Sequence, residues 1–85
     1  MKTNSKIILS KAAIKQLDNL DKPVRLRVFR ELKQLENNPL AGKALTGDLQ
    51  GARTFRVGKY RIIYQMSDYN ITVLTIKHRK KVYNP

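Results

Sequence analysis

Hydrophobic residues recur with two different periods along the chain, and the change of period separates predicted helices from predicted strands. Between residues 10 and 37 they recur every three or four positions, the spacing that places side chains on one face of an α-helix. From residue 52 onward they recur mostly every second position, as in a half-buried strand. The pattern predicts helices in the first half and a sheet in the second.

The first half is predicted to form a short strand and a helical hairpin. Lys6 to Leu9 predicts the strand, and Ser10 is a favourable N-cap for a helix that continues to about Leu20. Proline is tolerated in the first turn of a helix, so a second helix is predicted from about Pro23 to Asn37, ended by Asn37-Asn38-Pro39. The positions predicted to face the core are Ala13, Leu17, Leu20, Val24, Val28, Leu32 and Leu35.

The second half is predicted to form an antiparallel meander of three strands. Leu40 to Gly51 contains three glycines and predicts an irregular loop with room for one helical turn. The strands follow at Ala52 to Val57, Tyr60 to Ser67 and Ile71 to Lys77, and Gly58-Lys59 suits a type II′ turn between the first two. We therefore expect a single α+β domain over residues 1–85, with the order β-α-α-β-β-β and an antiparallel sheet packed on the helical hairpin.

Strand alternation divides the side chains of this sheet between two faces. The predicted core face holds Phe55, Val57, Tyr60, Ile62, Tyr64, Leu74 and Ile76. The opposite face holds Thr54, Arg56, Arg61, Ile63, Thr75, Lys77 and, if the last strand continues, Arg79 and Tyr83.

Arg56 and Arg61 then lie opposite each other across the hairpin, where like charges destabilise a sheet. Guanidinium groups match phosphate oxygens, so the pair, joined by Arg79, predicts an anion site. The alternative is a row of solvated arginines.

The charge of the whole chain also indicates a polyanionic partner, with a highly charged solvated surface as the alternative. Eighteen Lys and Arg against six Asp and Glu give a formal net charge of +12. The residues predicted to contact the phosphates of such a partner outside the arginine cluster are Arg53, Lys59, Lys77, His78, Lys80 and Lys81. His78, the only histidine, is also a candidate for proton transfer. Strand alternation, however, places it on the face of the sheet opposite that of Arg79.

Several classes of protein are disfavoured by what the sequence lacks. The chain has no cysteine, hence neither a disulfide framework nor a thiolate zinc site, which fits a reducing cytoplasm. Its longest apolar runs are far too short for a membrane span. Six dispersed acids and one histidine provide no spaced set of metal ligands, and the glycines lack the spacing of a phosphate-binding loop. We expect no cofactor and no metal, so any catalysis would depend on Arg, Lys, Tyr and His.

Three segments of the chain resemble a known family. Leu45 to Gly51, followed by "FRVGKYRIIY" at 55–64 and "HRKKVY" at 78–83, is similar to the RelE-type toxins of the RelE/ParE superfamily, over essentially the whole chain. The resemblance implies a microbial-ribonuclease-like toxin that cuts messenger RNA in the ribosomal A site, without metal, by attack of the ribose 2′-hydroxyl on the adjacent phosphate. It also implies an acidic RelB-like antitoxin as partner, besides the ribosome and the mRNA.

The resemblance implies roles for single residues. Arg61 matches the phosphate-stabilising arginine, and Arg56 matches a basic position of the preceding strand. Arg79 matches the C-terminal arginine that stabilises transition-state charge or helps the leaving group, and Tyr83 the C-terminal tyrosine that activates the 2′-hydroxyl or stacks on a base. Thr54 departs from the family, which has a lysine there, and Arg53 could substitute only if the strand carried a bulge. Two other functions stay open: a ParE-like DNA gyrase inhibitor without catalysis, and a basic nucleic-acid-binding protein with weakened chemistry.

Overall fold

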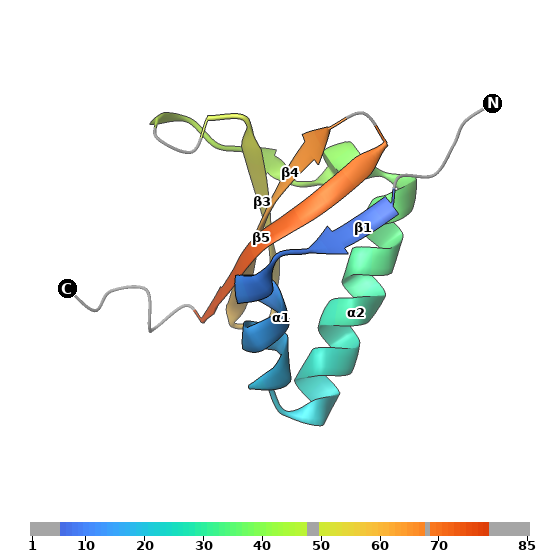
Figure 1. The fold of residues 1–85 in the computed structure, drawn as a ribbon, viewed down its shortest axis with the longest axis vertical. Coiled ribbons are helices and arrows are strands. Elements are labelled where there is room, and N and C mark those ends of the chain that lie inside the picture. Colours follow the sequence, from blue (N-terminus) through green and yellow to red (C-terminus); the bar gives the residue numbers. More distant parts are fainter. Residues whose placement is uncertain (1–5, 48–49, 68, 79–85) are drawn as a thin grey trace.

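The computed structural model describes residues 6–47, 50–67 and 69–78, which form two helices packed on a mixed sheet (Figure 1). The elements are β1 (Lys6–Leu9), α1 (Lys11–Asp18), α2 (Lys22–Asn37), the 3₁₀ turn η1 (Pro39–Ala41), β2 (Lys43–Ala44), β3 (Ala52–Val57), β4 (Tyr60–Ser67) and β5 (Asn70–His78). The predicted α+β class and helical hairpin are confirmed. Within the described residues, no helix is long and apolar enough to span a membrane.

The sheet has five strands in the order β1-β5-β4-β3-β2. Its β3, β4 and β5 form the predicted antiparallel meander, and β1 pairs parallel to β5, so the sheet is mixed although mostly antiparallel. The helical hairpin lies between β1 and the later strands in the sequence, and such a long connection allows a parallel pair. The segment predicted as an irregular loop contains η1 and the two-residue β2, which pairs with β3.

Ser10 joins the start of α1 to the sheet. Its hydroxyl oxygen accepts from the backbone N–H of Ala13 at 3.0 Å and donates to the carbonyl of Leu74 at 2.8 Å. The predicted N-cap is therefore confirmed, and it also connects the helix to β5.

The core lies between the helices and one face of the sheet. Its buried side chains are Ala13, Leu17, Leu20, Val28, Leu32, Leu35, Val57, Ile62, Tyr64, Ile71, Val73 and Ile76, with Val24, Phe55 and Tyr60 packed against them. The predicted core positions of both helices and of the hairpin are thus confirmed.

Leu74 is the exception, because β5 contains a bulge. The register with β4 shifts between Ile63, which pairs with Thr75, and Tyr64, which pairs with Val73. Leu74 is the extra residue, so Val73 takes the core position that alternation had assigned to Leu74. All six residues from 71 to 76 are apolar or β-branched, so the alternation gave no sign of the shift.

Gln16 of α1 binds β5 directly beyond the bulge, and this contact gives a prediction for stability. Its Oε1 accepts from the backbone N–H of Ile76 at 2.7 Å, and its Nε2 donates to the hydroxyl of Thr75 at 3.1 Å. We expect Gln16→Leu to lower the free energy of unfolding by about 1–3 kcal/mol, because the N–H of Ile76 loses its acceptor. Urea unfolding measures this, with Gln34→Leu on the exposed face of α2 as the matched control. Equal losses in both variants would contradict the prediction.

Candidate nucleic-acid interface

Arg56 and Arg61 are register partners across the β3–β4 hairpin, as the sequence predicted. Both side chains are exposed on the sheet face opposite the core. Between the strands Gly58 has a φ of +61°, the left-handed conformation that a primed hairpin turn requires at its first central residue. The tight turn therefore holds two guanidinium-bearing residues side by side on one face.

Lys77 extends this pair into a row across three strands. It is the register partner of Arg61 on β5, and it is exposed. Residues paired across a sheet project to the same face, so Lys77 lies on the face of the two arginines. We call Arg56, Arg61 and Lys77 the basic row.

A pocket of 440 Å³ lies at one end of the basic row. Its lining residues are Ala41, Lys43, Thr54, Phe55, Arg56 and Arg61. Lys43 was missed by the sequence analysis, because β2 is only two residues long and lies within a glycine-containing segment without hydrophobic alternation. Among these lining residues three are cations and none is acidic, which suits an anion such as a phosphodiester.

Arg53 lies on the other face of the sheet, away from the pocket. Its Nε donates to the carbonyl of Gly42 at 3.0 Å, and a terminal nitrogen donates to the carbonyl of Leu40 at 3.4 Å. The register of β3 with β4 runs without a shift from Ala52 to Val57, so the bulge that would have turned Arg53 toward the basic row does not occur. The structure thus does not bring this predicted RNA-binding residue to the site.

Tyr64 fastens the segment before β2 to the sheet. Its hydroxyl accepts from the N–H of Gly42 at 3.0 Å and donates to the carbonyl of Pro39 at 2.6 Å. A Cβ at position 42 would approach the Tyr64 hydroxyl to 2.7 Å and the carbonyl oxygen of Thr54 to 2.9 Å, so glycine is required there. The position of the pocket wall therefore depends on a buried tyrosine.

Lys59 and His78 line a different pocket, on the helix side of the sheet. This pocket of 410 Å³ is lined by Val24, Arg27, Val57, Gly58, Lys59, Tyr60 and His78. The imidazole of His78 packs edge-on against the ring of Tyr60, with centroids 5.0 Å apart, as the parity of β5 predicted. Neither Lys59 nor His78 is brought to the pocket of Arg56 and Arg61.

The predicted site residues Arg79, Lys80, Lys81 and Tyr83 lie outside the described residues and stay predictions. Within the described ranges, no three His, Cys, Asp or Glu side chains come together as a candidate metal site.

Residues 7–83 match the family model described as ParE toxin of the type II toxin–antitoxin system parDE. The search of curated proteins gave no match.

Solved structures share the fold at low sequence identity. The RelBE2 toxin–antitoxin complex of Mycobacterium tuberculosis contains a chain with a TM-score of 0.83 and 26% identity, covering 91% of this chain and 100% of that one. The RelE–RelB complex of Pyrococcus horikoshii gives 0.75 and 28%, covering 91% and 97%. The YoeB dimer of Staphylococcus aureus gives 0.73 and 21%, covering 89% and 98%, and its likeness supports the fold alone.

Proposed function

Because the chain belongs to the ParE toxin family of type II toxin–antitoxin systems, we propose that its toxic activity is cleavage of messenger RNA in the ribosomal A site. The observation that carries this proposal is the pocket beside the basic row, where Arg56 and Arg61 lie on an exposed sheet face together with a third cation. Three cations around one open pocket match the charge of an RNA phosphate that gains negative charge during cleavage. The structural neighbours titled RelE and YoeB share this fold.

In the proposed reaction, the ribose 2′-oxygen forms a bond to the adjacent phosphorus, and the bond from phosphorus to the 5′-oxygen breaks. A base takes the 2′-hydroxyl proton, and the 5′-oxygen receives a proton as it leaves. The products are a 2′,3′-cyclic phosphate and a free 5′-hydroxyl. Arg56 and Arg61 stabilise the charge on the non-bridging oxygens, while Arg79 and Tyr83 are proposed for the leaving-group and 2′-hydroxyl roles, which are among those that the family resemblance implies.

Inhibition of DNA gyrase without catalysis is the second candidate function. It is favoured by the family model, whose description names ParE rather than RelE. A gyrase inhibitor needs a binding surface but no converging cations around a substrate phosphate, so the geometry of the pocket favours the nuclease.

One experiment separates the two functions. Purified toxin is added to a translation extract, and the 5′ ends of the message are mapped by primer extension. In parallel, the toxin is added to a gyrase supercoiling reaction. We expect cuts within the A-site codon and normal supercoiling. Intact message with blocked supercoiling would overturn the nuclease proposal.

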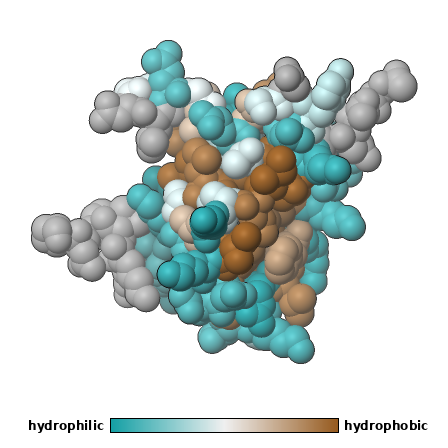
Figure 2. Space-filling model, in the orientation of Figure 1, coloured by the Kyte–Doolittle hydropathy of each residue, from teal (hydrophilic) through white to brown (hydrophobic). Residues whose placement is uncertain are grey.

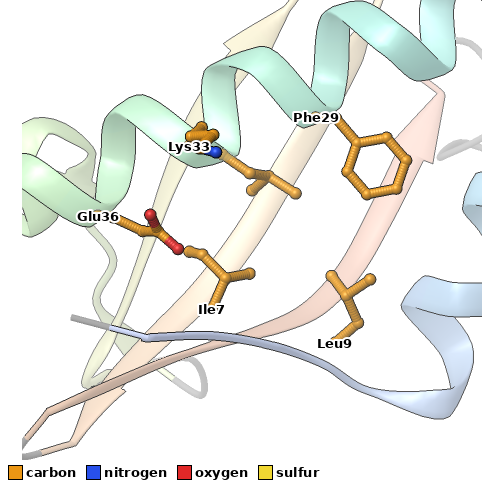
Figure 3. Close-up of a pocket in the computed structure, with 6 residues that line it drawn as sticks. Ile7, Leu9, Phe29, Lys33 and Glu36 are labelled. Atoms are coloured by element: carbon orange, nitrogen blue, oxygen red, sulfur yellow. The ribbon is translucent and has the colours of Figure 1, made fainter. Parts of the chain in front are cut away.

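The proposal includes an acidic, RelB-like antitoxin, and a groove between β1 and α2 is the surface that we assign to it. The groove has a volume of 320 Å³ and is lined by Ile7, Leu9, Phe29, Leu32, Lys33 and Glu36. Ile7 and Leu9 point from β1 toward α2, whose Phe29 points back toward Leu9 (Figure 3). Hydrophobic side chains also gather on the surface over this region (Figure 2).

The position of β1 favours an antitoxin segment over a small molecule as the occupant. In the sheet as described, β1 is an outer strand, so its free edge offers backbone groups to an added strand beside the apolar groove. β5, in contrast, lies between β1 and β4, so the last strand offers no comparable edge along Asn70 to Val73. The net charge of +12 on the whole chain favours association with an acidic partner.

Phe29→Lys is expected to weaken antitoxin binding at least tenfold without unfolding the toxin. Phe29 is 46% exposed, so its replacement opens no core cavity, but a lysine places a charge in the apolar groove. Coexpression with the acidic antitoxin, followed by calorimetric titration, measures the affinity. Met66→Lys, at a position 39% exposed outside the groove, is the matched control. Equal affinities for the two variants would show that the antitoxin docks elsewhere.

A further inference from the structure

We infer that Lys43 is a phosphate-contacting residue of the toxin, and that it supplies the positive charge that Thr54 does not. The inference rests on the proposed function, which it deepens by naming a third cation for the scissile phosphodiester. The observation behind it is that Lys43, Arg56 and Arg61 line one pocket, although Lys43 is far from the two arginines in the sequence.

The register of β2 with β3 places Lys43 beside Thr54. The two residues are partners in the antiparallel pair, so both project to the same sheet face, with Cβ atoms about 5 Å apart. A lysine side chain is long enough to cover that separation. The ammonium group of Lys43 can therefore reach the space above Thr54, on the side of Arg56 and Arg61.

Thr54 itself has its hydroxyl proton committed to the sheet. Its Oγ1 donates to the carbonyl of Ile62 at 3.0 Å. A phosphate above this position would receive no donated proton from Thr54. In the lining of the pocket, Lys43 is consequently the cation on the Thr54 side, whereas Arg56 and Arg61 serve the other side.

The backbone just before Lys43 is fixed by three hydrogen bonds. Gly42 donates to the hydroxyl of Tyr64, and its carbonyl accepts from Arg53. The same hydroxyl donates to the carbonyl of Pro39. If Lys43 lay on a flexible loop, the loop would lose conformational entropy when the lysine bound a phosphate. Because the backbone before Lys43 is already fixed, this entropic cost of binding is smaller. Arg53 thus acts as a positioning residue for Lys43 rather than as a ligand of RNA.

The test compares three proteins in the ribosome cleavage assay: Lys43→Ala, the double variant Lys43→Ala with Thr54→Lys, and Lys15→Ala as a control of equal charge on the exposed side of α1. We expect Lys43→Ala to cleave about ten to a hundred times more slowly and the control to cleave normally. The double variant should regain most of the lost rate, because its new lysine reaches the same space. A variant that only disturbed the fold would not be rescued in this way.

The outcomes separate this inference from the proposed function. If Arg61→Ala is inactive while Lys43→Ala cleaves like the control, the nuclease stands and the assignment of Lys43 falls. If Lys43→Ala cleaves slowly and the double variant with Thr54→Lys is equally slow, the assignment also falls. The lost rate would then not be due to the loss of a positive charge at this point of the sheet face. If the wild-type protein cuts no message, the proposed function falls.

Binding to a 2′-O-methyl RNA oligonucleotide, which cannot be cleaved, then tests Lys43 alone. Loss of one phosphate contact should reduce the slope of log affinity against log salt by about 0.7 in Lys43→Ala. An unchanged slope would overturn the assignment.

Discussion

Arg61→Ala is expected to cut messenger RNA on the ribosome about 10²–10³ times more slowly than the wild-type toxin, the cost of removing one donor to a developing oxyanion. Arg61 lies in the middle of the basic row, with Arg56 on one side and Lys77 on the other. Arg61 also lines the pocket, so a phosphate bound there lies within its reach. Of the other cations that line the pocket, Lys43 lacks the two parallel donors of a guanidinium, and Arg56 contacts the phosphate from its own position on β3.

The same substitution should leave the fold intact. Arg61 is exposed and faces two like charges, so its removal costs no buried contact and relieves repulsion. Single-turnover cleavage and urea unfolding are both measured, with Arg30→Ala, an exposed arginine of α2, as the control. Cleavage at the control rate by Arg61→Ala would remove the basis of the proposed active site.

Tyr64→Ala is expected to lower the free energy of unfolding by about 3–5 kcal/mol, the usual cost of truncating a buried aromatic side chain. Tyr64 has an exposed fraction of 0%, and its ring packs edge-on against Phe55 with centroids 5.9 Å apart. Domains of this size are stable by roughly 4–13 kcal/mol, so the loss is a large share of the total. Urea unfolding followed by circular dichroism measures it.

Tyr64→Phe separates packing from hydrogen bonding. The phenylalanine keeps the ring but leaves the N–H of Gly42 and the carbonyl of Pro39 without their partner, at a cost of about 1–3 kcal/mol. Because this segment leads into Lys43, cleavage should also slow when measured well below the unfolding temperature. Tyr69→Phe, at a position 68% exposed, is the matched control. Wild-type stability in Tyr64→Phe would show that these two hydrogen bonds contribute nothing measurable.

Much of this fold was predictable because its elements are long enough to show a period. The apolar stripe of α2 and the alternation of β3 and β4 each extend over several repeats, so helix, hairpin and core face could be assigned from the sequence. The opposition of Arg56 and Arg61 followed from the two-residue turn at Gly58-Lys59.

The features that were missed depend on contacts between distant segments. The parallel pairing of β1 with β5 is decided by how the helical hairpin packs, and nothing within Lys6–Leu9 encodes its partner. Lys43 joins the site only because β2 pairs with β3. Arg53 was predicted as an RNA-binding residue, and the hydrogen bonds of its guanidinium to the carbonyls of residues 40 and 42 could not be predicted from the sequence. Strand pairing and side-chain contacts between distant segments produce no periodic pattern in the sequence, so they could not be predicted from it.

The bulge at Leu74 decides which face the end of β5 presents. Before the bulge, Ile71 and Val73 face the core, and after it Ile76 does, so the extra residue shifts which positions face the core. If the same residues paired with β4 without a bulge, regular alternation from Val73 would turn Lys77 toward the helices instead of toward Arg61. Deletion of Leu74, in contrast, would leave Val73, Ile76 and Lys77 on their present faces, because the shortened strand then alternates regularly. The basic row therefore depends on the extra residue being accommodated in the bulge, and not on which side chain stands at position 74.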